Sequence, residues 1–229
     1  MENVHLQHTN RQYEEELRGL RTSLLQMGGL VERQIANAID SLVERDSELA
    51  RRTIAKDAEV NRMDIDVDAL CIRLLALRQP AASDLRFITT GLKVTTDLER
   101  IGDNAVNICE RVLELSVEPQ LKPYLDLPRM AAAAQSMLKD SLDAFLRDDA
   151  ALAEEVIARD DEVDQLNYQM YRELLSYMAE DPHTIGRATR LLFISKYLER
   201  IADHATNIAE MVVFMVKGRT IRHMDKKKP

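Results

Sequence analysis

Tryptophan is absent from this chain of 229 residues, and glycine, proline and phenylalanine are scarce, with seven, six and four copies. A sheet-rich protein needs more aromatic and β-branched residues than this. Leucine, alanine, glutamate and arginine recur instead, and they favour helices that few glycines or prolines interrupt. Because 45% of the residues are hydrophobic, the chain can also bury a proper core. We therefore expect an all-α globular protein.

Positive charge, cysteine and long apolar runs are also in short supply. The formal net charge is −8 and the isoelectric point is near 5.3, which argues against a nucleic acid partner. Cys71 and Cys109 form no CxxC pair and lie in apolar helical patterns, so we interpret them as buried thiols in a reducing compartment. The amino terminus does not resemble a secretory signal, and the most apolar run, 211–216, is far shorter than the roughly 20 residues that span a bilayer. We expect a soluble, cytoplasmic protein.

No familiar catalytic motif is present in the sequence. It has no GxSxG, Walker, HExxH or paired-cysteine motif, and no Glu-x-x-His pairs of the kind that hold di-iron centres in helical bundles. We therefore predict that the protein is not an enzyme.

One acidic segment occurs twice. LERIGDNAVNICE, at 98–110, returns as LERIADHATNIAE, at 198–210, with nine of thirteen positions identical. Upstream, IAKD at 54–57 is answered by IARD at 157–160. The two offsets, 100 and 103 residues, place the change of length in the loop between the second and third helices. Such a repeat indicates the duplication of a three-helix unit.

Prolines and capping residues divide each half into three helices. The Gln-Pro pair at 79–80 is matched by Asp-Pro at 181–182, and Ser83 or Asp84 could cap the helix that follows the first pair. The predicted helices span about 14–45, 47–77, 83–116, 129–146, 149–179 and 184–216.

Short loops between these helices predict antiparallel neighbours. We expect two sequence-related three-helix bundles packed side by side, one at 1–118 and the other at 119–217. A basic tail follows at 218–229, which we interpret as a solubilising segment. The alternative for this tail is a contact with an acidic partner or a membrane surface.

Each half carries an acidic stripe opposite an apolar one. The predicted apolar stripe of the third helix is Val94, Leu98, Ile101, Ala105, Ile108 and Val112. The opposite side carries Glu99, Asp103, Asn107 and Glu110, matched in the second half by Glu199, Asp203, Asn207 and Glu210. The second helix of each half adds Asp57, Asn61, Asp64 and Asp68 or Asp160, Asp164 and Asn167.

These stripes place like charges together. Glu99 lies four residues from Asp103, and Glu199 lies four from Asp203, a spacing that costs about 0.2–0.5 kcal/mol per pair. A bound cation would relieve this repulsion, and carboxylate and amide oxygens suit hard or borderline metal ions. The ordinary alternative is a solvated acidic helix face. His204 adjoins Asp203 but is matched by Asn104 in the other repeat, so we interpret it as surface variation.

Two segments carry a recognisable pattern: QPAASDLRFITTGLKVTTDLERIGDNAVNICE at 79–110 and LLFISKYLERIADHATNIAEMVVFMVKGRTIRH at 191–223. Together they resemble the PhoU family of accessory regulators of phosphate uptake, and the resemblance covers both repeats. It implies two similar three-helix bundles without enzymatic activity. It also implies negative regulation of the phosphate-starvation response, through contacts with the ATPase subunit of a phosphate ABC transporter and with the phosphate-sensing histidine kinase. Contact with the membrane would then come only through these partners.

The resemblance also implies metal sites, because members of the family bind metal clusters through E/D-x-x-x-D motifs. Carried onto this sequence, the implied ligands are Glu99, Asp103, Glu199, Asp203, Asp160, Asp164, Asp57 and Asn61. Second-rank candidates for metal or partner contact are Asn107, Asn207, Asp64 and Asn167. The ions would be divalent or trivalent, with Mg, Mn, Fe and Zn left open. Because Asn61 is neutral, the first-half site should bind more weakly or hold a different ion.

Two other functions stay open at this point: a metal-dependent carboxylate-cluster enzyme, and a non-catalytic helical scaffold without metal. We also expect a homodimer, because long bundles often pair through apolar stripes left on their surface.

Overall fold

Six long helices make up the protein in the computed structural model, which describes residues 2–218, with side chains from residue 11 onward. They are α1 (Glu2–Glu44), α2 (Ser47–Arg78), α3 (Ala82–Ser116), α4 (Asp126–Arg147), α5 (Ala150–Glu180) and α6 (Ile185–Lys217), with a short 3₁₀ turn, η1 (Pro182–Thr184), before α6. No strand occurs within this described part of the chain. The all-α prediction is confirmed, and only α1 departs from its expected bounds by more than a few residues.

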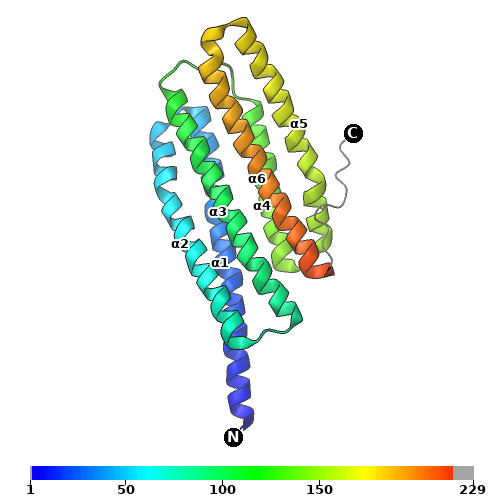
Figure 1. The fold of residues 1–229 in the computed structure, drawn as a ribbon. Helices are drawn as coiled ribbons and strands as arrows, with labels where there is room; N and C mark the ends of the chain where they lie inside the picture. The colour runs from blue at the N-terminus through cyan, green and yellow to red at the C-terminus, as the bar shows by residue number, and fades with distance from the viewer. Residues whose placement is uncertain (1, 219–229) are drawn as a thin grey trace.

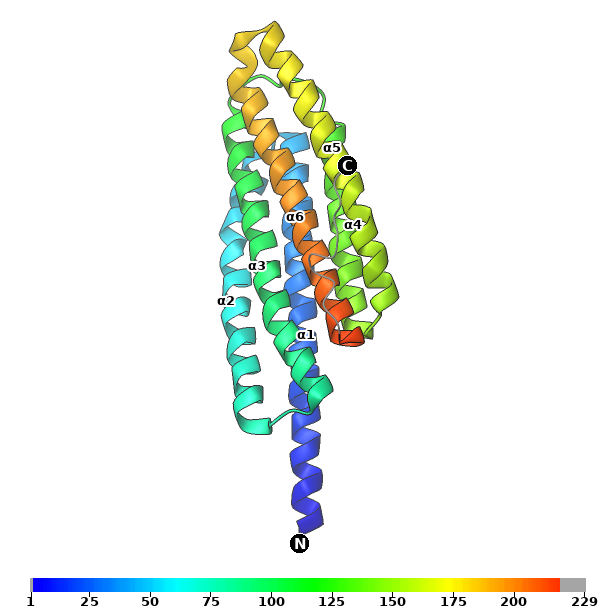
Figure 2. The same ribbon diagram turned by 45° about the vertical axis from the view of Figure 1, so that its right-hand side comes forward.

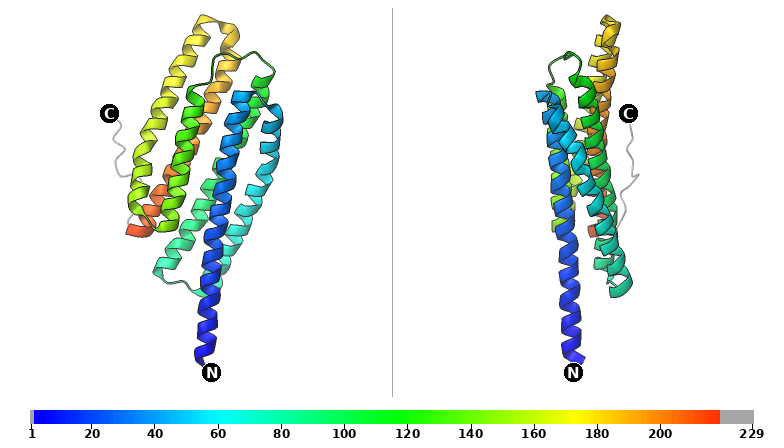
Figure 3. Two further views of the ribbon diagram at one scale, coloured as in Figure 1. Left: turned by 180° about the vertical axis from the view of Figure 1, so that it is seen from behind. Right: turned by 90° about the vertical axis from the view of Figure 1, so that its left-hand side faces the viewer.

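The helices form two layers. In one layer α2, α3, α6 and α5 lie side by side, and α1 and α4 form a second layer behind it (Figure 1). The edge-on view in Figure 3 separates α1 from the layer that contains α2 and α3. At the centre of this layer, α3 and α6 pack against each other and run antiparallel (Figure 2). The first three helices lie on one side of this contact and the last three lie on the other. The predicted pair of three-helix bundles packed side by side is confirmed.

The apolar stripes of α3 and α6 supply the centre of the core. All six predicted stripe residues of α3 are at most 1% exposed. Their counterparts on α6 are fully buried, and they are Ile194, Leu198, Ile201, Ala205, Ile208 and Val212. Cys71 and Cys109 are buried free thiols, as predicted, and burial raises the pKa of each to about 12. Neither thiol is therefore a reactive thiolate at neutral pH.

Two aspartates cap equivalent helices in the same way. Asp46 accepts hydrogen bonds from two backbone amides of the first turn of α2 at 2.9 Å, and Asp149 does the same for α5 at 3.0 Å. The preceding residues, Arg45 and Asp148, both have a left-handed backbone, with φ of 56° and 54°. The repeat therefore extends to the turn before the second helix of each half, at an offset of 103 residues.

The start of α3 differs from the prediction. Neither Ser83 nor Asp84 caps this helix, because it already begins at Ala82, after Ala81, and no side chain caps it. Asp84 instead accepts a hydrogen bond from the Tyr13 hydroxyl of α1 at 2.9 Å. Its carboxylate still lies in the first turn, where it interacts favourably with the helix dipole.

Apolar and charged contacts join the two halves. Phe87 of α3 stacks on Phe145 of α4 with ring centroids 5.1 Å apart. Arg190 of α6 bonds Glu114 at 2.7 Å and Glu118 at 2.9 Å, near the end of α3. The halves therefore share one core and do not merely touch at a solvated surface.

No helix in the described part of the chain is both long and apolar enough to cross a membrane. The predicted basic tail, 218–229, lies outside the described residues except for Gly218. That glycine follows α6 with a φ of 68°, the left-handed backbone common just after a helix end.

Candidate metal-binding faces

The acidic stripes of α2 and α3 meet along the boundary between these helices. We call this set the first acidic face, and it consists of Asp57, Asn61, Asp64, Glu99 and Asp103. Burial raises the pKa of Glu99, and the charges of Asp103, Asp64 and Asp57 raise it further. Burial and Asp57 likewise raise the pKa of Asp103. The structure thus brings the predicted like charges of two helices together, and Asp64 acts on Glu99 as part of the same group.

Two amide groups already bond Asp57. Gln34 of α1 donates from Nε2 to Oδ1 at 3.2 Å, and Asn61 donates from Nδ2 to Oδ2 at 2.9 Å. Asn61, a predicted ligand, therefore turns its donor and not its oxygen towards Asp57. Its amide would have to turn before it could bind a cation.

The second acidic face lies along α5 and α6 and consists of Asp160, Asp164, Asn167, Glu199 and Asp203. Burial raises the pKa of Asp203 to about 6, and three neighbouring carboxylates of this face add to the effect, whereas Lys196 opposes it. Asp160 is only 4% exposed and accepts a hydrogen bond from the Thr206 hydroxyl at 3.3 Å. Each face therefore has four carboxylates and one amide, and the two faces differ in which helix position of the pair holds the amide: Asn61 answers Asp164, and Asp64 answers Asn167.

Two members of the second acidic face are engaged by α6. The Lys196 ammonium lies 2.6 Å from the carboxylate oxygens of Glu199, and the buried Ser195 hydroxyl donates to Asn167 Oδ1. A cation at this face would compete with the Lys196 ammonium for Glu199, and Asn167 would have to leave Ser195 to act as a ligand.

The chemistry of both faces fits a hard metal ion, because carboxylates that raise one another's pKa gain from a shared cation. However, no three or more His, Cys, Asp or Glu side chains in the described part of the chain are gathered closely enough to hold a metal ion. Binding would therefore require side-chain rotation at either face. The predicted metal ions and their ligands stay predictions.

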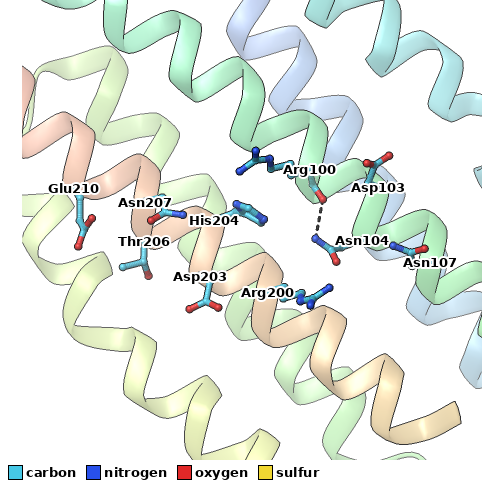
Figure 4. Close-up of a pocket in the computed structure, with 10 residues that line it drawn as sticks. All are labelled: Arg100, Asp103, Asn104, Asn107, Arg200, Asp203, His204, Thr206, Asn207 and Glu210. Carbon is cyan, nitrogen blue, oxygen red and sulfur yellow. Dashed lines mark hydrogen bonds between the residues drawn. The ribbon is translucent and has the colours of Figure 1, made fainter. Parts of the chain in front are cut away.

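A groove of about 520 Å³ lies between α3 and α6 on the side of the molecule shown in Figure 4. Equivalent pairs from the two repeats line it, together with two further residues of α6: Arg100 and Arg200, Asp103 and Asp203, Asn104 and His204, Asn107 and Asn207, and then Thr206 and Glu210. The second-rank candidates Asn107 and Asn207 therefore line this groove. Figure 4 also shows Asn104 donating to the Arg100 carbonyl at 2.8 Å.

His204 is more than surface variation, contrary to the sequence interpretation. Its side chain is 17% exposed, and Nδ1 lies 2.8 Å from Oδ1 of Asp97 on α3. The pair joins the two halves. The sequence analysis missed it because Asp97 stands just before the repeated segment, and Tyr197 replaces it in the other half.

Gln34 is a second residue that the sequence analysis missed. It lies among buried residues of α1, between Val31 and Ile35, and is itself 4% exposed. An amide inside an apolar stripe was the available signal, because a buried polar side chain needs a partner.

Comparison with known proteins identifies the family. The chain matches the PhoU domain twice, over residues 24–112 and 127–212. A phosphate-specific transport system accessory protein PhoU homolog of Pseudomonas putida is 42% identical over 222 residues, which cover 96% of this chain and 87% of that protein. The phosphate-specific transport system accessory protein PhoU of Escherichia coli K12 is 39% identical over 217 residues, which cover 95% of this chain and 90% of that protein.

Solved structures agree with the sequence matches. The crystal structure of PhoU from Pseudomonas aeruginosa superposes with a TM-score of 0.87 at 42% identity and covers 90% of this chain and 100% of that one. The phosphate transport system regulatory protein PhoU from Streptococcus pneumoniae gives 0.85 at 33% identity and covers 91% and 99%. These relatives are named as accessory or regulatory proteins, not as enzymes. With both halves matched and the fold shared, this chain belongs to the PhoU family and is not an enzyme.

Proposed function

We propose that this protein is an accessory regulator of phosphate uptake that silences the phosphate-starvation response when phosphate is plentiful. It acts in the cytoplasm by contacting the ATPase subunit of a phosphate ABC transporter and the phosphate-sensing histidine kinase. The proposal is supported by the family, since its relatives are named for the phosphate-specific transport system. One acidic face lies along α2 and α3 and the other along α5 and α6, and each contributes one aspartate, Asp103 or Asp203, to the groove between α3 and α6, so that they offer two surfaces for such partners.

Metal on the acidic faces is the means that we propose for this regulation. The observation that carries it is the mutual crowding of carboxylates, which is strongest where the pKa of Asp203 reaches about 6. The ligands would be the carboxylates and amides of the two faces, and the chemistry that the ion supplies is neutralisation of charge. A neutralised face lets a partner surface dock without burying uncompensated carboxylates.

A homodimer is also part of the proposal. It is supported by large apolar side chains that are exposed on α2 and α5, among them Ile65, Ile72, Tyr168, Tyr171 and Leu175. Light scattering on the purified protein should give twice the mass of the chain, and a monomer at micromolar concentration would remove this part.

A reporter of the phosphate regulon tests the regulatory role. In a strain that lacks the gene, grown in high phosphate, the wild-type protein should silence the reporter. A variant with alanine at Glu99, Asp103, Glu199 and Asp203 should fail to silence it while folding to the same helical content. If the deletion strain keeps the reporter silent, the proposed role is wrong.

A charge-matched control separates the faces from net charge. Alanine at Glu14, Asp66, Glu155 and Asp161 removes four exposed carboxylates that belong to neither acidic face. This control should silence the reporter as the wild type does, and metal analysis of all three proteins should find less metal only in the face variant.

A further inference from the structure

The two acidic faces differ in what supports them. Asp57 and Asp160 are equivalent residues, and each accepts a hydrogen bond from a helix other than its own. The donor to Asp57 is Gln34 of α1, and the donor to Asp160 is Thr206 of α6.

Neither donor is repeated in the other half. At the offset of 103 residues that relates the caps Asp46 and Asp149, the counterpart of Gln34 is Met137, which is buried. At the offset of 100 residues that relates α3 to α6, the counterpart of Thr206 is Val106. Each half has therefore acquired its own way of holding the equivalent carboxylate.

Gln34 lies in an environment where an apolar side chain would cost less free energy, unless the amide group contributes to function. The side chain is 4% exposed, and Oε1 is buried without a hydrogen-bond partner among the described residues. It lies against Gly102 of α3, where an added Cβ would stand 3.1 Å from Gln34 Oε1 and 3.4 Å from Asp57 Oδ1. The second half has Ala202 at this position. The glycine therefore makes room for the amide and the carboxylate together.

We propose that Gln34, with the space left by Gly102, is a positioning residue that makes the first acidic face a cation site distinct from the second. Its bond to Oδ1 fixes the Asp57 carboxylate while Oδ2 turns from the Asn61 amide to the ion. Its buried Oε1 adds a neutral oxygen from a third helix beside the carboxylates. This inference rests on the proposed metal function.

Manganese titration tests the inference on the full-length protein. A Glu199→Gln/Asp203→Asn background disables the second acidic face, so that calorimetry and the Mn²⁺ electron paramagnetic resonance signal report the first. In this background, Gln34→Met copies the second half. It should weaken Mn²⁺ binding by about tenfold, the lower end of what loss of a supporting hydrogen bond costs a metal site.

Thermal unfolding of the metal-free protein should not show the loss that Gln34→Met causes in Mn²⁺ affinity. Methionine removes a buried oxygen that has no partner, and although it also removes the donor to Asp57, that half-buried carboxylate can bond water instead, so Gln34→Met should leave the midpoint unchanged or raise it. Asn37→Leu, one turn further along α1 and half-buried, is the matched control and should leave Mn²⁺ affinity unchanged. Gly102→Ala is an independent variant: its Cβ crowds the Gln34 amide and Asp57, and it should also weaken Mn²⁺ binding in a folded protein.

The outcomes separate the inference from the function on which it rests. If the background protein binds Mn²⁺ and both Gln34→Met and Gly102→Ala bind it equally well, Gln34 is not a positioning residue, and the proposed metal function stands. A fall in both affinity and unfolding midpoint for Gln34→Met would assign Gln34 a structural role only and overturn the inference. If the wild-type chain binds none of Mn²⁺, Mg²⁺, Fe²⁺ and Zn²⁺, the metal part of the proposed function fails.

Discussion

Asp203 is the residue of the second acidic face whose ionisation is most opposed by its surroundings. Its pKa is raised to about 6 by burial and by three carboxylates nearby. A carboxyl group whose folded-state pKa lies above its unfolded value binds its proton more tightly in the folded protein. The free energy of unfolding therefore increases as the pH falls from above 6 towards about 4, and this gain is absent at higher pH.

Asp203→Asn should consequently stabilise the metal-free protein at pH 7.5 and should do so only about half as much at pH 5, where the carboxyl group is mostly protonated in the folded protein but still ionised in the unfolded chain. After allowance for partial exposure we expect about 1 kcal/mol at pH 7.5, which corresponds to a rise in melting temperature of about 2–4 °C. Circular dichroism melts at the two pH values, with EDTA present, measure the difference. An equal shift at both pH values would show that charge on Asp203 is not the cause.

The same group makes metal binding depend on pH. In a Glu99→Gln/Asp103→Asn background, Mn²⁺ must displace the proton of Asp203 once the pH is below about 6. We expect roughly a tenfold loss of Mn²⁺ affinity between pH 7 and pH 5, because ligands must be deprotonated to bind. Calorimetric titrations across this range measure the change. An Mn²⁺ affinity that does not vary with pH would show that Asp203 is not a ligand.

Among the secondary-structure elements, α3 has a C-terminal end whose carbonyl groups bind a side chain from outside the helix. Arg45, which follows α1, donates from Nη2 to the carbonyls of Leu115 and Ser116 at 3.2 and 2.9 Å and also to that of Glu118. These carbonyls lie at and just beyond the last turn of α3, where helix carbonyls lack intrahelical donors, and the Leu115 carbonyl also accepts from the Glu118 amide at 3.2 Å. In the second half Asp148 stands in place of Arg45 and cannot donate to a carbonyl from its ionised side chain.

Arg45→Met should therefore lower the free energy of unfolding by about 1–3 kcal/mol, the usual value for removing a charged donor from partly buried acceptors. Urea denaturation followed by circular dichroism measures it. Arg62→Met, at an exposed position of α2, serves as the control and should change stability by less than about 0.5 kcal/mol. Equal effects of the two substitutions would show that the α3 carbonyls find water instead.

At the scale of the whole molecule, the halves have separate repeats but a common core. Phe145 is 1% exposed and stacks across the boundary on Phe87. Its removal should be felt by both halves, because the cavity would open between them.

Phe145→Ala should lower the free energy of unfolding by about 3–5 kcal/mol. We expect wild type and variant each to unfold in a single transition. The backbone amides of α2 and α5 should lose their protection from hydrogen exchange together. Two separated transitions, one for each half, would contradict a shared core.

The sequence was sufficient for the fold because local signals agreed. Few glycines and prolines interrupt the helices, and the buried stripe of α3 lies where the apolar spacing placed it. It was sufficient for the acidic faces as well, since Glu99, Asp103, Glu199 and Asp203 repeat at one spacing. It was not sufficient for Gln34, Thr206 and the Asp97–His204 pair. Their partners lie on other helices, and each differs between the repeats, so neither periodicity nor the repeat could reveal them.

The antiparallel packing of α3 against α6 has an evolutionary consequence. The Asp97–His204 contact lies on an approximate two-fold relation between the halves, and the symmetry-related positions hold Tyr197 and Asn104. In a symmetric dimer of one three-helix unit, every mutation would have altered both copies at once. Once the two copies were joined in one gene, each could change alone, so that one ancestral surface could give rise to two with different ligands.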